Sequence, residues 1–215
     1  NALGTMNVFE AARKAKVARL VYASSAAIYG DNANLPLSET EKPAPLSPYG
    51  MDKWYGENIA QLYFHLHGIS SAGMRFFNVY GPKQDPKSPY SGVISIFLGA
   101  AQQDKELTIF GDGEQSRDFI YVKDIITAIL LAMNSENKNA AVFNVASGTE
   151  ITLNQLIETM NASLQKTIQK KYLPPRAGDI VKSAANISHI YSALGFRTQH
   201  SLAEGLKVTY ESLTR

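Results

Sequence analysis

The sequence predicts an α/β fold in which helices connect the strands of a parallel sheet. Residues 20–23 form a short apolar run of β-prone side chains, and a second run of this kind follows at residues 71–77. Between them, residues 49–67 carry apolar side chains at the i, i+3, i+4 and i+7 spacing of one helix face. These side chains belong to Ile59, Leu62, Tyr63 and Leu66. The order of strand, helix and strand is typical of a parallel sheet with a crossover helix.

Residues 1–16 are predicted to form the first helix, because apolar side chains recur at helical spacing and Arg13, Lys14 and Lys16 stand at its end. Basic side chains are favoured there by the helix macrodipole. The segment has no long apolar core and no cleavage-type site, so it does not resemble a signal peptide. No stretch of the chain approaches the ~20 apolar residues that a membrane span needs. We therefore expect a soluble, cytoplasmic protein without a membrane partner.

The apolar run at residues 20–23 breaks into two small hydroxyl residues, Ser24 and Ser25. The run is typical of a buried parallel strand, whose carboxyl end would present both serines. Open α/β sheets bind their ligands at this end of the strands. Serines at the end of a strand also cap the following turn, so a purely structural role stays open.

The helix at residues 49–67 opens with Tyr49 and Lys53, and Ser47-Pro48 is a typical helix entry. Positions four apart lie on the same helix face, so the ammonium group can sit beside the phenol. A fixed positive charge favours the phenolate, which could take a proton from an alcohol. Because the same spacing arises by chance in many helices, the neighbouring segments have to support this chemistry.

Residues 31–48 are rich in Pro, Asn, Ser and Glu and are predicted to form an exposed loop. The composition changes again from Gln84, which suggests a crossing into a smaller second domain. Further helices are expected at residues 91–103, at residues 125–133 and after Thr152, and further strands at residues 107–110 and 119–122.

Three positions in this second half are assigned to turns and caps. Gly111-Asp112-Gly113-Glu114 joins two short strand-like runs and is interpreted as a hairpin turn. Asp124 is expected to cap the helix at residues 125–133, and Thr152 is expected to cap the helix that follows it.

Composition narrows the class of protein. The chain has 215 residues, 45% hydrophobic and 19% charged, enough for one large domain or one and a half. Its 21 Lys+Arg and 19 Asp+Glu give a net charge of +2, which suggests no nucleic acid or anionic membrane as a partner. The absence of cysteine excludes disulfides, a thiol nucleophile and a Cys-ligated metal. The four histidines show no metal-binding motif, so no metal site is predicted.

Two segments, S-S-A-A-x-Y-G at residues 24–30 and S-P-Y-G-x-x-K at residues 47–53, together resemble the extended short-chain dehydrogenase/reductase family, in particular its nucleotide-sugar epimerases. The resemblance implies a partial Rossmann fold, with a doubly wound parallel sheet and a smaller C-terminal α/β substrate domain, and NAD as cofactor. Ser25, Tyr49 and Lys53 match the family's catalytic triad. Tyr49 would be the acid/base, Ser25 would hydrogen-bond the reacting sugar hydroxyl, and Lys53 would hold the nicotinamide ribose and tune Tyr49.

Further segments extend the resemblance to cofactor-binding positions. N-A-L-G-T at the start resembles the N-x-x-G-T of a Rossmann helix and implies that Asn1 lies near the cofactor. The segment R-F-F-N-V-Y-G-P resembles R-x-F-N-x-x-G-P, in which Asn78 reaches the sugar nucleotide and the backbone at Phe77 touches the nicotinamide amide. Ser24 is also matched to a cofactor-binding position. Taken alone, the asparagine is equally typical of a cap before a turn.

The remaining matches concern the substrate. In R-D-F-I-Y-V-K-D, Arg117 matches a diphosphate-binding arginine, and a planar guanidinium can hold two phosphate oxygens at once. P-R-A-G-D resembles P-x-R-x-G-D, which places Arg176 on the diphosphate and Asp179 on the uridine ribose. Ser183 matches a gatekeeper that faces carbon two of the hexose, where a small residue leaves room for an acetamido group. The other positions matched to substrate binding are Val93, Thr108 and Phe110.

The resemblance also implies a strand and a glycine turn at residues 143–148 and a closing helix from Ser201, and it divides the chain. It assigns residues 1–83 to the C-terminal part of the NAD-binding Rossmann domain and residues 84–215 mainly to the substrate-binding domain, with residues 118–146 as a candidate return to the Rossmann core. The family's glycine-rich phosphate-binding turn has no match in the sequence. We therefore expect the sequence to be the C-terminal two-thirds of an enzyme. A protein of only this length is expected to bind NAD weakly or not at all and to be inactive.

Ala26 and Ala27 discriminate among the family's reactions. Relatives that eliminate water carry an Asp-Glu pair here, because elimination needs an additional base and acid, and decarboxylating relatives carry a glutamate matching Ala27. The triad alone supports reversible oxidation of one hydroxyl. This predicts a UDP-hexose 4-epimerase of the UDP-glucose/UDP-galactose type or its N-acetylated counterpart. The alternatives are an ADP-heptose epimerase and a catalytically silent sugar-nucleotide-binding protein.

A homodimer is expected as well. The helices at residues 1–16 and 49–67 match the pair that forms a four-helix dimer interface in this family. Their apolar surface would comprise Tyr55, Ile59, Tyr63 and Leu66. The same helix face could instead pack inside one chain.

Overall fold

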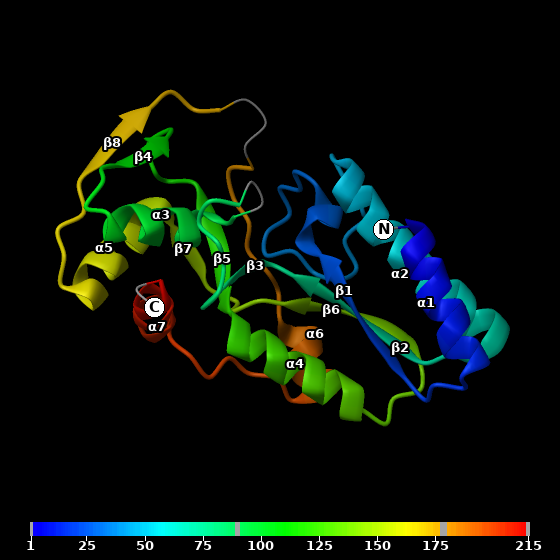
Figure 1. Cartoon of the computed structure of the whole chain (residues 1–215). Helices are drawn as coiled ribbons and strands as arrows, with labels where there is room; N and C mark the ends of the chain where they lie inside the picture. The colour runs from blue at the N-terminus through cyan, green and yellow to red at the C-terminus, as the bar shows by residue number, and fades with distance from the viewer. Residues whose placement is uncertain (1, 89–90, 177–179, 214–215) are drawn as a thin grey trace. The chain divides into compact units, whose positions relative to one another are not determined.

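The computed structural model describes residues 2–88, 91–176 and 180–213 and confirms the predicted α/β fold (Figure 1). Packing divides the chain into two compact units. The first unit comprises Asn1–Phe77, Ile126–Ala146 and Ala185–Arg197, and the second comprises Asn78–Ile125, Ser147–Ala184 and Thr198–Arg215. These units follow from packing alone, whereas the domains expected from the resemblance are defined by function and stay a prediction.

The first unit is built on a parallel sheet with the strand order β1-β2-β6. Its strands are β1 (Leu20–Ser25), β2 (Ser71–Phe76) and β6 (Ala140–Val145), and its helices are α1 (Ala2–Lys14), the 3₁₀-helix η1 (Ala26–Tyr29), α2 (Pro48–His67), α6 (Ser188–Leu194) and the part of α4 (Val122–Asn134) from Ile126. Ser25 pairs with Phe76, and Phe76 pairs with Val145. The carboxyl ends of the three strands therefore lie level at one edge of the sheet.

Helices α1 and α2 pack against each other beside the sheet, and α6 packs against β6 (Figure 1). Phe9 of α1 is fully buried against Ile59 and Ala60 of α2, and the centre of its ring lies 5.5 Å from that of Tyr63. Burying one such ring contributes roughly 1.5–3 kcal/mol. Two side chains expected at a dimer interface, Ile59 and Tyr63, thus pack inside the chain, whereas Leu66 is 59% exposed.

The second unit encloses an apolar core between short sheets and three helices. Its elements are β3 (Asn78–Tyr80), α3 (Val93–Gln102), β4 (Leu107–Phe110), β5 (Ser116–Tyr121), β7 (Glu150–Thr152), α5 (Leu153–Leu164), β8 (Lys170–Leu173) and α7 (Leu202–Ser212). Strand β5 pairs in parallel with β3 and antiparallel with β7, and β4 pairs in parallel with β8. Leu98, Leu156 and Leu206, from α3, α5 and α7, meet in the core without solvent exposure.

The predicted hairpin around Gly111–Glu114 is wrong, because β4 and β5 belong to different sheets. The ladder between β4 and β8 continues beyond the strand, where the Gly111 N–H donates to the Leu173 carbonyl at 2.8 Å. The chain then turns away at Gly111 and Gly113, whose φ angles of 83° and 81° lie in the region that favours glycine. Val122, expected at the end of a strand, is the first residue of α4.

Asp124 does not cap α4, because the helix begins two residues earlier. Its carboxylate lies in the first helical turn, where negative charge suits the macrodipole. The buried group instead accepts the backbone N–H of Gln199 at 3.1 Å and lies 2.8 Å from Nδ1 of His200. The residue expected to start one helix therefore fixes the segment that leads into another, α7.

Other predicted helix starts are confirmed. The Ser47 side chain caps α2, and Thr152 forms a capping box with Gln155 at the start of α5. Ser201 caps α7 in the same way through Glu204. Each cap satisfies an N–H group that the helix itself leaves without a partner.

Residues 31–47 form the predicted loop, but the loop is only partly exposed. Leu37 is buried and pairs with Ala185, and the Glu39 carboxylate accepts the Asn144 N–H at 2.7 Å. The loop is therefore anchored to β6 and to the segment before α6. No helix in the described part of the chain is long and apolar enough to cross a membrane.

Candidate active site

The carboxyl end of β1 presents Ser24 and Ser25 to opposite faces of the sheet, because side chains alternate along a strand. The Ser24 hydroxyl donates to Oε1 of Glu57 in α2 at 2.5 Å. The Ser25 hydroxyl accepts the Ala27 N–H at 3.1 Å and caps η1. The capping role that the sequence left open is thus present at Ser25, and its catalytic role stays a prediction.

The first turn of α2 lies directly against η1. A Cβ atom at Gly50 would come within 2.6 Å of the Ala27 carbonyl oxygen, so the contact requires glycine. Tyr49 stands one residue before Gly50, and its side chain is 51% exposed. The strand end with Ser25 and the helix start with Tyr49 therefore belong to two segments in close contact.

Lys53 lies one helical turn beyond Tyr49. Its ammonium Nζ donates to the Ala23 carbonyl of β1 at 2.9 Å and lies 5.6 Å from the centre of the Tyr49 ring. The predicted juxtaposition of positive charge and phenol is therefore present. A cavity of about 450 Å³ in the first unit, between α1, β1 and α2, is lined in part by Lys53.

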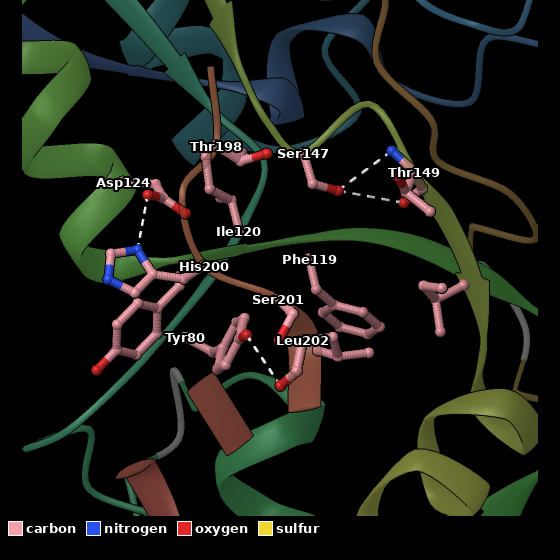
Figure 2. Close-up of a pocket in the computed structure, with 12 residues that line it drawn as sticks. Tyr80, Phe119, Ile120, Asp124, Ser147, Thr149, Thr198, His200, Ser201 and Leu202 are labelled. Atoms are coloured by element: carbon pink, nitrogen blue, oxygen red, sulfur yellow. Dashed lines mark hydrogen bonds and ion pairs between the residues drawn. The ribbon is translucent and has the colours of Figure 1, made fainter. Parts of the chain in front are cut away.

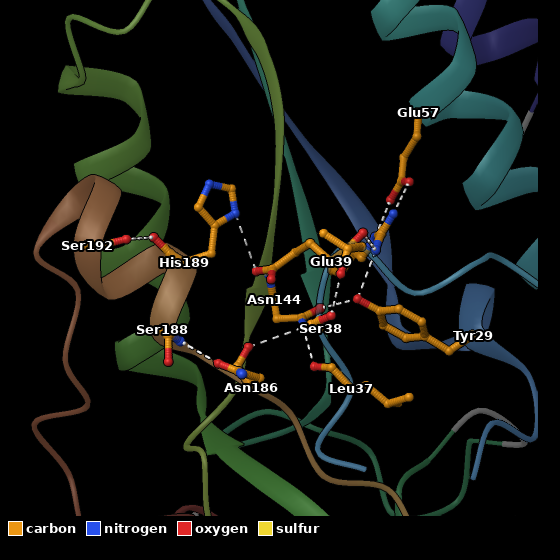
Figure 3. A network of polar contacts seen from close by, with 12 residues as sticks. Tyr29, Leu37, Ser38, Glu39, Glu57, Asn144, Asn186, Ser188, His189 and Ser192 are labelled. Carbon is orange, nitrogen blue, oxygen red and sulfur yellow. Dashed lines mark hydrogen bonds and ion pairs between the residues drawn. The ribbon is translucent and has the colours of Figure 1, made fainter. Parts of the chain in front are cut away.

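A buried ion pair, absent from the sequence predictions, lies one further turn along α2. Glu57 accepts Nε and Nη2 of Arg75 at 2.9 and 2.7 Å, and the two side chains are only 7% and 4% exposed (Figure 3). Burial opposes the charge of Arg75, but the hydrogen bonds and charge of Glu57 outweigh it and raise the pKa of the guanidinium. Sequence reasoning missed the pair because its partners lie 18 positions apart on different elements.

The polar contacts continue from the ion pair to the loop at residues 31–47. Arg75 donates to the Tyr29 hydroxyl at 2.8 Å, and this hydroxyl donates to the Asn144 side chain at 2.6 Å (Figure 3). The Asn144 amide donates in turn to the Leu37 carbonyl at 2.8 Å. Burial raises the pKa of Tyr29 to about 12. The strand ends, α2 and the loop are thus joined by one hydrogen-bonded network.

In the second unit, a cavity of about 240 Å³ collects five of the predicted substrate-binding residues. These are Val93, Thr108, Phe110, Arg117 and Arg176. The Arg176 guanidinium lies 3.6 Å from the centre of the Phe110 ring, close enough for a cation–π interaction, and Arg117 donates to the Ser116 carbonyl at 2.7 Å. The cavity lining therefore combines apolar side chains with two guanidinium groups.

Five further residues of this cavity were not predicted. They are Ile96, Phe97, Ile109, Gln115 and Leu153. The apolar spacing of residues 91–103 indicated a helix face, but an apolar face packed in a core and one that lines a cavity have the same pattern.

The remaining predicted residues lie elsewhere. Asn78 donates to the Asp118 carbonyl at 3.0 Å and lines a neighbouring cavity, and the Ser183 N–H donates to the Ser116 carbonyl at 3.2 Å. Phe77 is buried in the core of the first unit. The predicted residues Asn1 and Asp179 lie outside the described residues.

Figure 2 shows a cavity of about 230 Å³ in the second unit that contains none of the predicted site residues. The Asp124 carboxylate and the His200 ring face each other in its wall (Figure 2). Tyr121 also lines the cavity, and burial raises the pKa of its phenol, with the charge of Asp124 adding to the effect. No group of three or more potential ligands in the described residues could hold a metal ion.

The chain is thus an α/β protein in which a strand of the parallel sheet ends at Ser25, next to the helix start that carries Tyr49 and Lys53. Residues 1–146 match the NAD dependent epimerase/dehydratase family, and the chain belongs to this family.

Several known proteins are similar to the whole chain. The putative UDP-glucose 4-epimerase of Methanocaldococcus jannaschii is 39% identical over 208 residues, which cover 96% of this chain and 67% of the relative. The structure of UDP-N-acetylglucosamine 4-epimerase from Methanobrevibacter ruminantium M1 in complex with UDP-N-acetylmuramic acid is 37% identical, with a TM-score of 0.93 over 98% of this chain and 67% of that one. That of UDP-glucuronic acid 4-epimerase from Bacillus cereus in complex with UDP-glucuronic acid and NAD is 29% identical, with a TM-score of 0.87 over 98% and 66%. The chain thus spans about two thirds of the length of these relatives.

Proposed function

We propose that the complete gene product is an NAD-dependent epimerase that inverts the C4 hydroxyl of a UDP-hexose. The observation that carries the proposal is the Tyr49 and Lys53 pair on the first two turns of α2, beside the strand end that holds Ser25. Family membership and the names of the relatives, which are UDP-sugar 4-epimerases, support it.

The three side chains have separate tasks in this reaction. Tyr49 takes the proton of the C4 hydroxyl and later returns it, and Ser25 hydrogen-bonds the same hydroxyl. Lys53 stabilises the phenolate by its positive charge. When bound, NAD supplies a reversible hydride acceptor. Ala26 and Ala27 carry no further acid or base, so elimination of water is not expected.

The residues on α2 fit a nicotinamide ribose. An ammonium has three N–H donors, and Lys53 directs one of them to the Ala23 carbonyl. The others can bind ribose hydroxyls, and the group lines a cavity in the first unit. Ser24 and Phe77, also matched to cofactor binding, are buried, so we expect them to act through the backbone or by supporting the site.

The cavity in the second unit fits the nucleotide part of the substrate. Arg117 and Arg176 supply planar guanidinium groups for a diphosphate, and Phe110 supplies an apolar surface. Uridine is favoured over adenosine because the relatives named above act on or bind UDP-sugars. Acceptance of N-acetylated hexoses is the finer proposal, and it rests on Ser183 being small.

Incubating the complete gene product with NAD and each nucleotide sugar tests the function. We expect interconversion of UDP-glucose with UDP-galactose and of the corresponding N-acetylhexosamines, measured by chromatography of the products. ADP-heptose is the comparison substrate. Binding of UDP-sugars without interconversion would favour the silent binding protein, and turnover of ADP-heptose alone would favour the other alternative.

Tyr49→Phe tests the acid/base assignment in the same assay. The change removes the hydroxyl and keeps the ring, so turnover should fall by roughly two to four orders of magnitude while UDP-sugar binding persists. Near-normal turnover would contradict the assignment. Tyr191→Phe on α6, whose side chain is 46% exposed, is a matched control that should keep full turnover.

We further propose that the complete gene product forms a homodimer through α1 and α2. Leu3, Leu62 and Leu66 on these helices are 71%, 47% and 59% exposed, which is an apolar surface of the kind that oligomers cover. A dimeric mass by light scattering is the expected result, and a monomeric mass at micromolar concentration would exclude the dimer. A cytoplasmic location also stays a prediction.

A further inference from the structure

The buried Glu57–Arg75 ion pair takes no part in the reaction steps described above, and its position on α2 suggests why it is there. Tyr49, Lys53 and Glu57 follow one another at intervals of four residues, so they lie along one face of the helix. This face carries the proposed acid/base, then the proposed ribose-binding ammonium, and then a carboxylate with two buried partners.

Two successive turns of α2 hold the end of β1. Lys53 donates to the Ala23 carbonyl at 2.9 Å, and Glu57 accepts the Ser24 hydroxyl at 2.5 Å. Arg75 of β2 fixes the Glu57 carboxylate by a two-pronged contact, which sets its direction as well as its distance. The ion pair therefore restrains the helix relative to two neighbouring strands, immediately before Ser25.

We propose that Glu57 and Arg75 are positioning residues that hold the Tyr49 and Lys53 face of α2 in register with Ser25. The inference rests on the proposed function. A misplacement of about 1 Å between reacting groups can lower turnover about a hundredfold. A rigid link one turn from Lys53 and two turns from Tyr49 on the same helix therefore has kinetic consequences. The pair should affect turnover and the protonation behaviour of the site, and it should leave UDP-sugar affinity in the second unit unchanged.

The double variant Glu57→Leu/Arg75→Met separates positioning from stability. Replacing a buried ion pair by apolar side chains of similar volume is often neutral or stabilising. The hydroxyls of Ser24 and Tyr29 each lose one partner, which lowers the stability, but we expect the complete gene product to stay folded. We expect kcat for UDP-sugar epimerisation to fall at least tenfold, KM to change less than twofold, and the pH profile of kcat to shift. Arg75→Lys keeps the positive charge and loses the two-pronged contact with Glu57. Its kcat should therefore lie between that of the wild type and that of the double variant.

Ile190→Ala is the matched control, because Ile190 is fully buried in α6, which packs against β6. It should lower the melting temperature and leave kcat per folded molecule unchanged. The positioning role is refuted if the folded double variant keeps kcat within twofold of the wild-type value. It is also refuted if the decrease in kcat is no larger than in Ile190→Ala. If the double variant does not fold, the kcat of Arg75→Lys is compared with the wild type and with Ile190→Ala by the same criteria. Absence of epimerisation in the wild type would instead refute the proposed function.

Discussion

At the scale of single residues, Ser183 offers the sharpest test of substrate choice. Its backbone N–H is bonded to the Ser116 carbonyl, which places it beside the strand that carries Arg117. Ser183→Tyr would put a large ring there, and steric exclusion discriminates more strongly than a lost contact. We expect catalytic efficiency with N-acetylated UDP-sugars to fall at least tenfold more than with the plain sugars.

Val181→Tyr is the control for this change, because Val181 lies two residues away in the same segment and is 63% exposed. It should affect both substrate types equally and weakly. If Ser183→Tyr lowered catalytic efficiency equally for N-acetylated and plain UDP-sugars, the gatekeeper assignment would be wrong.

Contacts between site residues were predictable from the sequence where the two partners lie close together in the same helix. Tyr49 and Lys53 are four apart on one helix, so local geometry alone brings them together. Glu57 and Arg75 were missed because only the packing of α2 on β2 makes them partners. Asp124 was misassigned because a carboxylate near a helix start looks like a cap, whereas its partners lie 75 and 76 positions away.

At the scale of elements, the capping box of α5 is a local device whose contribution can be measured. The Thr152 hydroxyl accepts the Gln155 N–H, and the Gln155 side chain accepts the Thr152 N–H. Thr152→Ala should lower the free energy of unfolding by about 1 kcal/mol, measured by chemical denaturation. Thr159→Ala in the middle of α5 should be neutral or slightly stabilising, because alanine has the higher helix propensity. Equal losses for both variants would contradict the capping account.

Helix starts were predicted better than strand pairing, and the reason is the range of the interactions. Caps such as Thr152 and Gln155 are three residues apart, whereas β4 finds its partner β8 some sixty positions later. Gly111 and Gly113 correctly indicated a change of direction, but a turn does not specify which strand comes to lie alongside.

For the whole molecule, buried tyrosines predict a loss of stability in alkali. Burial raises the pKa of Tyr22 and Tyr80, and it raises that of Tyr29 to about 12. An unfolded chain releases these protons near pH 10, while the folded chain still holds them. The unfolded state then binds fewer protons, so the free energy of unfolding should decline as the pH rises from about 10 towards 12.

Denaturation of the complete gene product at pH 8, 10 and 11 checks this. Tyr29→Phe should lower stability at pH 8, because Arg75 and Asn144 lose a shared partner, and should flatten the decline above pH 10. An unchanged slope in this variant would show that Tyr29 does not contribute to the alkaline transition.

The α/β class was predictable because alternation of apolar strands and amphipathic helices repeats along the chain. The resemblance implied a return of residues 118–146 to the first domain, but composition and periodicity do not indicate which segments join in each compact unit, because each unit is assembled from three separate segments. Such an assembly depends on contacts between distant parts of the sequence, of which residues 185–197 beside β6 are an example.

The two adjacent serines at the end of β1 also determine what a one-residue shift in the register of this strand would remove. A slip of one residue exchanges the two faces of a strand. If β1 moved back by one position, Ser25 would occupy the place of Ser24 and its hydroxyl could donate to Glu57. Ala26 would then occupy the place of Ser25, where no hydroxyl would remain. Moving β1 forward would keep a hydroxyl at the second place and put Ala23 at the first. The backward slip therefore removes the proposed catalytic hydroxyl and keeps the contact with Glu57, whereas the forward slip removes the contact with Glu57 and keeps a hydroxyl at the catalytic place.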